Sequence, residues 1–326
     1  MKKTYLILLL YSFSYIVNSQ KIIKTLSFKS ANPFSFYDII TNLKNQEEQE
    51  VKGILTIPAN GSDSLKKYPL VIGVAGSLGW KDHHYEYLEM YQEMGIATFE
   101  LNSFKSRNIV STVGSQTEVT TATMVLDAYR ALELLSIHPS IDKNNVSITG
   151  WSLGGGVTLF SAWLPLKNAI TKNLSFASHL AFYPACFINP EDISFSKSPI
   201  HILIGELDNW TPSQACIDLV KILKRETNID ITVYKDSHHG FDRDSPVVVN
   251  DNAYNFTKCK FKLTKNGQIL MNYINIPMSN PYLQKLGLVF CVSRGVNIGG
   301  NPSSRKLSFK FAKDFMKKTI LNNEIK

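Results

Sequence analysis

Short runs of apolar and β-branched residues alternate with segments of helical periodicity through the middle of the chain. The strand-like runs are residues 51–57, 69–75, 96–101, 146–149, 178–183, 200–205 and 229–234. The helical segments are residues 84–94, 118–136, 154–164, 212–226 and 305–318. Such an alternation predicts an α/β fold with a mostly parallel central sheet and helices on both faces. In such sheets, functional groups gather at the carboxyl ends of the strands.

Two parts of the chain fit this alternation poorly. Residues 20–50 are weakly patterned and are predicted to form an edge strand followed by a solvated arm. Residues 250–281 are predicted to be an inserted loop or hairpin. The length of 326 residues favours about two domains as a first estimate. The continuous order of strands and helices instead predicts that residues 20–326 form a single domain.

The first 19 residues have the three-part pattern of a secretory signal peptide. Lys2 and Lys3 precede an uncharged, mostly apolar run of 13 residues, and small side chains follow at the cleavage position before Gln20. The run is shorter than the roughly 20 residues that cross a bilayer, although a retained anchor is the alternative. The pattern predicts a secreted or periplasmic protein with no stable membrane insertion after signal cleavage.

Composition and charge exclude several classes of function. The chain is 44% hydrophobic and 19% charged, which is typical of a folded protein and not of a disordered one. The net charge of +8 raises the possibility of a nucleic-acid or acidic-lipid surface. Removing the leader lowers this charge to +6. The C-terminal basic residues follow an amphipathic helix, so the remaining charge is interpreted as scattered and solvated, and no nucleic-acid partner is predicted.

Four cysteines occur in a chain that is predicted to be exported into an oxidising compartment. They allow three pairings, of which chain order and predicted strand-end positions favour Cys186–Cys216 and Cys259–Cys291. Free buried thiols are the alternative.

No pattern in the sequence predicts a metal or cofactor. No CxxC occurs, and no Cys lies at ligand spacing from a His. His83 and His84 lack a third ligand nearby and are interpreted as surface histidines. The sequence also contains no phosphate-binding loop and no GxGxxG motif.

One motif predicts nucleophilic catalysis. The strand at 146–149 continues into Gly150-Trp151-Ser152-Leu153-Gly154, and a helix follows. A G-x-S-x-G motif at a sharp turn from strand to helix presents the serine hydroxyl above the sheet, next to free N–H groups of the helix. The alternative is a Gly-rich turn in which Ser152 only caps the helix.

A serine nucleophile needs a base, and the base needs a group that orients it. Strand 200–205 is followed by Glu206 and Asp208, and strand 229–234 is followed by His238 and His239. Both pairs stand at strand ends, in the chain order Ser, acid, His that this architecture uses. We predict Asp208 as the acid and His239 as the base, with Glu206 and His238 as the alternatives.

The same residues resemble a known family. The segments GWSLGGG, GELDNWTP and YKDSHHGFD, in this order and spacing, are similar to the dienelactone hydrolase family of α/β-hydrolases. The resemblance implies an α/β-hydrolase fold, with Ser152 as nucleophile, Asp208 as acid and His239 as base. The chain departs from the founding members in having serine where they have cysteine, and in its predicted export. Both departures argue against transferring the dienelactone substrate itself.

An oxyanion formed on Ser152 would need two main-chain N–H donors. Leu153, directly after the nucleophile, is predicted to supply one. The loop after strand 69–75 is predicted to supply the other from Ser77, with Leu78 as the neighbouring option. Family members usually have His-Gly at the start of this loop, where this chain has Ala75-Gly76.

Several further side chains are predicted near the substrate because they follow strand ends or motif residues. Arg107 is a candidate for binding a substrate carboxylate, with a structural salt bridge as the alternative. The other candidates for the pocket wall are Trp80, Tyr183, Trp210 and His238.

Together these features predict a secreted serine hydrolase that cleaves small carboxylic esters or lactones through an acyl-enzyme. Two alternatives remain at this stage. One is a peptidase or polyester hydrolase that uses the same triad, and the other is a non-catalytic binding protein with the hydrolase fold.

Overall fold

A mixed eight-stranded sheet forms the centre of the computed structural model, which describes residues 21–58, 66–271 and 274–322. The predicted signal peptide lies outside the described residues. The strand order is β1-β2-β4-β3-β5-β6-β8-β9. Strands β1 and β2 run antiparallel to their neighbours, and the other pairs are parallel. The strands are β1 (Ile22–Ala31), β2 (Glu48–Ile57), β3 (Tyr68–Val74), β4 (Ala97–Leu101), β5 (Ile141–Trp151), β6 (Ser178–Phe182), β8 (Ile200–Gly205) and β9 (Ile229–Tyr234).

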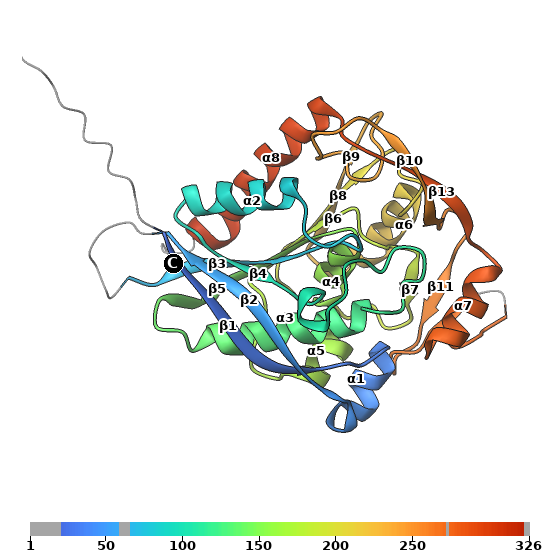
Figure 1. The fold of residues 1–326 in the computed structure, drawn as a ribbon, viewed down its shortest axis with the longest axis horizontal. Helices are drawn as coiled ribbons and strands as arrows, with labels where there is room; N and C mark the ends of the chain where they lie inside the picture. The colour runs from blue at the N-terminus through green and yellow to red at the C-terminus, as the bar shows by residue number, and fades with distance from the viewer. Residues whose placement is uncertain (1–20, 59–65, 272–273, 323–326) are drawn as a thin grey trace, which may run out of the picture.

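Helices cover both faces of this sheet, as Figure 1 shows, with α2 and α8 above it and α3 and α5 below it. The helices are α1 (Phe36–Asn42), α2 (Asp82–Glu93), α3 (Thr121–Ser136), α4 (Leu153–Phe160), α5 (Leu164–Ile170), α6 (Ser213–Leu223), α7 (Pro281–Val289) and α8 (Pro302–Met316). Helices on both faces bury most of the residues of the central strands, and Leu70, Val71 and Ile72 of β3 have no exposed surface. The predicted fold class is therefore confirmed.

One predicted helix is two helices in the structure. The segment expected at 154–164 divides into α4 and α5, and Pro165 stands in the first turn of α5. Proline lacks an N–H and cannot continue a helix, but it is tolerated at a helix start. The apolar periodicity alone does not reveal this break.

The N-terminal part is more ordered than its pattern indicates. The predicted edge strand is present as β1, but the expected solvated arm is wrong, because residues 36–42 form helix α1 with Phe36 and Ile39 buried. Ser35 and Asp38 form a capping box at its start. This Ser-x-x-acid spacing is the signal in the sequence that indicates the helix.

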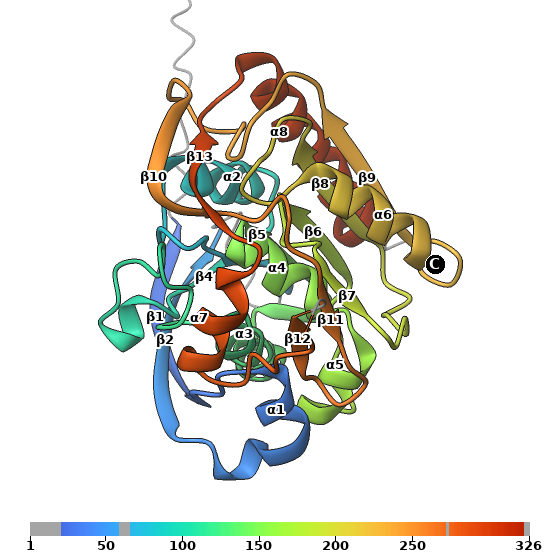
Figure 2. The ribbon, with the colours of Figure 1, turned by 90° about the vertical axis from the view of Figure 1, so that its right-hand side faces the viewer.

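A further layer lies over the carboxyl ends of the parallel strands, and we call its residues, 248–271 and 274–298, the cover segment (Figure 2). Its strands are β10 (Val248–Asn255), β11 (Phe261–Leu263), β12 (Ile269–Met271) and β13 (Ser293–Ile298), and it contains helix α7. Strands β10 and β13 pair with each other, and β11 and β12 form a hairpin that joins β7 (Ile188–Pro190).

Two disulfides hold this region. Cys259–Cys291 closes the cover segment, and Cys186–Cys216 ties the residues before β7 to α6. These are the pairings that chain order favours.

Within the described ranges, none of the helices has the length and apolar character needed to cross a membrane.

Candidate active site

Ser152 stands on a sharp turn between β5 and α4. Its backbone is in a strained conformation, with φ 58° and ψ −114°. The flanking glycines make this turn possible, because a Cβ on Gly150 would lie 2.2 Å from the Gly154 oxygen, and one on Gly154 would lie 2.1 Å from the Val74 oxygen. The Ser152 N–H donates to the Phe182 oxygen at 2.9 Å, which ties the turn to β6.

The three side chains predicted to form a triad meet at this turn. His239 Nε2 lies 2.9 Å from Ser152 Oγ, and His239 Nδ1 lies 2.7 Å from Asp208 Oδ2. His239 is 2% exposed and Asp208 is 4% exposed, so both interactions are shielded from water. The imidazole therefore lies between an acceptor that orients it and a hydroxyl whose proton it is placed to accept.

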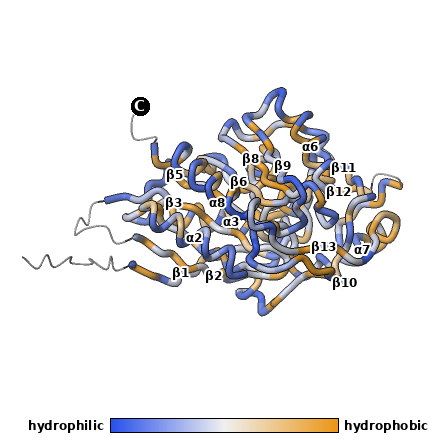
Figure 3. The backbone as a smooth tube through the Cα atoms, turned by 90° about the horizontal axis from the view of Figure 1, so that it is seen from above, coloured by the Kyte–Doolittle hydropathy of each residue, from blue (hydrophilic) through white to orange (hydrophobic). Residues whose placement is uncertain are grey.

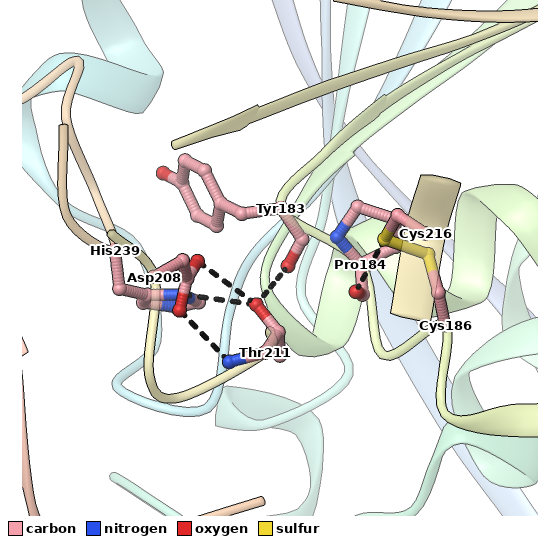
Figure 4. Close-up of a disulfide and its surroundings, with 7 residues drawn as sticks. All are labelled: Tyr183, Pro184, Cys186, Asp208, Thr211, Cys216 and His239. Atoms are coloured by element: carbon pink, nitrogen blue, oxygen red, sulfur yellow. Dashed lines mark hydrogen bonds and ion pairs between the residues drawn. A yellow bond between two sulfur atoms is a disulfide. The ribbon is translucent and has the colours of Figure 1, made fainter. Parts of the chain in front are cut away.

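Asp208 is held in one orientation by its own loop. Its Oδ1 accepts hydrogen bonds from the N–H groups of Trp210 (2.9 Å) and Thr211 (2.8 Å). The Thr211 hydroxyl lies 3.0 Å from Asp208 Oδ2 and 3.0 Å from the Tyr183 carbonyl oxygen (Figure 4). With Oδ1 occupied by the loop, Oδ2 is the oxygen that faces His239. The short turn Asp-x-x-Thr is a local signal in the sequence for this arrangement.

The alternative acid and base point elsewhere. Exposed Glu206 accepts a hydrogen bond from the Asp236 N–H at 3.1 Å. His238 Nδ1 lies 3.2 Å from the Leu207 oxygen, and His238 does not line the cavity beside Ser152, contrary to its assignment to the pocket wall. Consecutive residues of an extended loop point to opposite sides, so only one of the two histidines reaches the serine.

The two predicted oxyanion donors flank Ser152. Leu153 is the first residue of α4, so its N–H has no acceptor within the helix. Ser77 lies in a turn closed by a hydrogen bond from the Gly79 N–H to the Gly76 oxygen at 2.9 Å. A Cβ on Gly76 would lie 3.2 Å from Ser152 Cβ, so this turn passes directly beside the nucleophile. Both residues line the cavity described next.

A cavity of about 130 Å³ with a mostly apolar lining opens beside Ser152. Its walls come from the sheet region and from the cover segment, and none of the described side chains that line it is charged. Apolar members of the wall include Phe36, Ala185, Phe187, Ile188, Trp210, Phe256, Phe261, Ile269, Met278 and Leu288. Of these apolar wall residues, only Trp210 was predicted from the sequence. The others come close to Ser152 through contacts between segments that are distant in the chain.

Two other side chains assigned to the pocket wall, Trp80 and Tyr183, lie outside the cavity. Trp80 stacks on Tyr85 with ring centres 5.4 Å apart, and its Nε1 donates to the Leu101 oxygen, so it packs over the end of β4 and not in the cavity. Tyr183 also stays outside the cavity, but its ring lies 4.5 Å from that of His239 in a second, smaller recess that Ser152 also lines. Arg243, four residues after His239, also lines this recess.

Arg107 is a structural residue and not a substrate contact. Its guanidinium forms two bonds with the Asp127 carboxylate, at 2.7 and 3.0 Å, and it also donates to Asn32 and to the Ala31 oxygen. The Arg107 side chain is 7% exposed, and Asp127 is fully buried. This bidentate pair joins the end of β1 to α3.

His83 and His84 are buried, which corrects their interpretation as surface histidines. They are 4% and 2% exposed, because the first turn of α2 packs inward against the β5 end. The His84 ring stacks on Trp151 at 4.4 Å. The described residues contain no group of three potential ligands that could hold a metal ion.

A buried carboxyl group lies behind His239 next to these histidines. Asp242 has no exposed surface, and its Oδ1 accepts a hydrogen bond from the Tyr183 hydroxyl at 2.9 Å. Within the described part of the chain, Oδ2 has no hydrogen-bond partner, and His83 Nε2 lies 3.9 Å from Oδ1. Burial raises the pKa of Asp242 to about 6 and lowers the pKa of His83 to about 2. His83 is therefore neutral at neutral pH, and the contact is not an ion pair.

Replacing Asp242 by asparagine is expected to stabilise the protein more at pH 8 than at pH 4.5. The pKa of Asp242 is higher in the folded state than its ordinary value of 3.8, so the folded state loses stability as the pH rises from about 4 to about 6, and the full loss persists above pH 6. The variant has no charge to bury and keeps an acceptor for Tyr183. The difference between variant and wild type in free energy of unfolding should grow by about 1–3 kcal/mol between the two pH values.

This difference is measurable by denaturant unfolding at both pH values. Asp244→Asn, a substitution at an exposed neighbour, is the matched control and should show no such change. Equal effects of Asp242→Asn at both pH values would contradict the prediction.

Comparisons with known proteins agree with this geometry. The sequence model described as the dienelactone hydrolase family matches residues 89–261, a range that contains Ser152, Asp208 and His239. No curated protein matches the chain.

Two solved structures are similar over most of the chain. One is described as "m3DLH", with TM-score 0.57 and 14% identity over 91% of this chain and 99% of that one. The other is a dienelactone hydrolase-like promiscuous phosphotriesterase from metagenomic libraries, with TM-score 0.52 and 13% identity over 91% of this chain and 98% of that one. At such identities the similarity establishes the α/β-hydrolase fold.

Proposed function

This chain belongs to the dienelactone hydrolase family and is a carboxylic ester hydrolase, and from that premise we propose that Ser152 cleaves esters or lactones through an acyl-enzyme. The observation that carries the proposal is the position of His239, which lies within hydrogen-bond distance of both Ser152 Oγ and Asp208 Oδ2. A binding protein with this fold would not require all three groups in this arrangement.

The mechanism follows from these contacts. His239 Nε2 takes the Ser152 proton while Oγ attacks the ester carbonyl, and Asp208 stabilises the imidazolium that forms. The N–H groups of Leu153 and Ser77 donate hydrogen bonds to the oxyanion. His239 then gives the proton to the leaving alcohol, and water attacks the acyl-enzyme with His239 again acting as base.

The cavity indicates which esters fit. A cavity of about 130 Å³ is close to the size that accommodates a benzene molecule in a protein core, and its wall contains no charged side chain among the described residues. We therefore propose that one side of the substrate is a short alkyl or an aromatic group without charge. A long acyl chain would extend beyond the cavity.

We further propose that the protein acts outside the cytoplasm. The support is the leader pattern of residues 1–19 together with the two disulfides, which persist in oxidising compartments.

The substrate class is tested by comparing p-nitrophenyl acetate, butanoate, hexanoate and dodecanoate with a simple lactone and with peptide p-nitroanilides. We expect the largest kcat/KM for butanoate or hexanoate and very slow cleavage of the anilides. Faster cleavage of peptide amides than of every ester would replace the esterase proposal by the peptidase alternative.

Replacing Ile269 by phenylalanine is expected to shift this preference toward acetate. Ile269 projects from β12 into the cavity, and the larger ring fills space that the acyl chain needs. The ratio of kcat/KM for hexanoate to that for acetate should fall about tenfold, which corresponds to losing one or two buried methylene groups. Ile222→Phe, on the exposed side of α6, is the control and should leave the ratio unchanged. A ratio unaltered by Ile269→Phe would show that the acyl group lies elsewhere.

A further inference from the structure

The net positive charge of the protein comes mostly from the cover segment, which corrects its interpretation as scattered. Residues 248–298 contain six basic residues and one acidic residue, a net charge of +5, whereas the leader contributes two of the remaining three positive charges. The basic residues are Lys258, Lys260, Lys262, Lys265, Lys285 and Arg294, and all are exposed. The layer that covers the candidate active site is thus the basic part of the molecule.

Helix α7 in this segment turns an apolar side toward solvent. Tyr282 is 75% exposed, Leu286 40%, Val289 72% and Phe290 54%. Their spacing of four, three and one residues places them on one side of the helix, and we call these four residues the α7 stripe. Lys285 is exposed next to the stripe, and Leu288 on the opposite side lines the cavity beside Ser152. Figure 3 shows α7 at one end of the molecule, away from α2 and α8.

Exposed apolar side chains in such a group indicate a binding surface. The stripe is too small to bind a stable protein partner. A helix of nine residues is about 14 Å long and 10 Å wide, and the area of such a surface is far below the roughly 800 Å² that each partner of a stable complex buries. Aromatic and aliphatic side chains beside lysines are instead typical of helices that lie in a lipid–water interface. Lys285 beside the stripe and the other basic residues of the cover segment add attraction to anionic headgroups, and one or two basic residues near a membrane surface raise the affinity about tenfold.

We propose that the α7 stripe docks the protein on an anionic lipid surface. Tyr282, Leu286, Val289 and Phe290 enter the interfacial region, and the basic residues of the cover segment contact the lipid phosphates. Because the inner side of the same helix lines the cavity, docking places the candidate active site next to the lipid surface. This binding is peripheral and does not depend on catalysis.

Flotation of the intact protein with vesicles tests the proposal. The Ser152→Ala variant serves as the parent protein, so that hydrolysis does not enter the readout. We expect it to float with vesicles of phosphatidylcholine and phosphatidylglycerol in equal amounts, much less with phosphatidylcholine alone, and less at high salt. The double substitution Val289→Asp and Phe290→Asp should weaken binding to the anionic vesicles at least tenfold, and Lys285→Glu should weaken it to a smaller extent.

Matched controls are available at the opposite end of the parallel strands. Ile137→Asp changes an apolar residue that is 82% exposed, and Lys143→Glu changes an exposed lysine close to it. Both should float like the parent protein. Absence of flotation with anionic vesicles overturns the proposal, as does equal flotation of the double variant. Sedimentation velocity tests whether the stripe instead mediates self-association. A parent protein that is a dimer and does not bind vesicles, together with a double variant that is a monomer, would assign the stripe to self-association.

Discussion

Replacing Ser152 by alanine is expected to lower kcat for p-nitrophenyl butanoate by about 10⁴- to 10⁶-fold. The hydroxyl forms the covalent bond to the acyl group, and within the described structure no other nucleophile lies within hydrogen-bond distance of His239 Nε2. The variant keeps the cavity and the oxyanion donors, so it should still bind substrate and keep the residual acceleration that those groups supply. Initial rates with active-site titration measure the loss.

A fluorophosphonate probe provides an independent readout. The wild type should acquire one adduct, located on Ser152 by peptide mass spectrometry, and the alanine variant should acquire none. Ser303→Ala, in the exposed first turn of α8, is the control and should retain wild-type activity and labelling. Labelling of the Ser152→Ala variant at wild-type rate would overturn the proposed mechanism.

Replacing Asp208 by asparagine is expected to lower kcat by about 10⁴-fold at neutral pH. The N–H groups of Trp210 and Thr211 both donate to Oδ1, so the asparagine oxygen should remain at that position. The amide NH₂ then replaces Oδ2 and faces His239 Nδ1, where it can only donate. This fixes the imidazole with its proton on Nε2, where it cannot accept the proton of Ser152.

The neighbouring acid supplies the control for this variant. Glu206→Gln removes a carboxylate two residues away that contacts the Asp236 backbone and not His239, and it should change kcat less than about twofold. Thermal unfolding of both variants separates a catalytic defect from a folding defect. A larger loss in Glu206→Gln than in Asp208→Asn would reverse the assignment of the acid.

The parts of the fold that could be predicted are those whose pattern is local. The central strands are continuous apolar runs because both faces of the sheet are covered, and Ser152, Asp208 and His239 follow directly from strand ends. Strand β1 is exposed along most of its length because it lies at the sheet edge, and its hydrophobic pattern is correspondingly weak.

The remaining features depend on contacts between distant segments. Strands β7, β11 and β12 have three residues each, too few to show a period, and α7 carries apolar residues on the side that faces water. The pairing of Arg107 with Asp127 joins residues 20 positions apart, and the walls of the cavity come from both ends of the chain. The net charge of the cover segment can be counted in the sequence. Its position over the strand ends, next to the candidate active site, cannot be predicted from the sequence.

The two halves of the candidate site are held by different parts of the molecule. Ser152, Asp208 and His239 are positioned by the ends of β5, β8 and β9, whereas part of the cavity wall belongs to the cover segment, which is closed by Cys259–Cys291. Insertions and substitutions between Cys259 and Cys291 can therefore accumulate without displacing the triad. Evolution can change what such a protein accepts and where it binds while the bond-breaking groups stay the same.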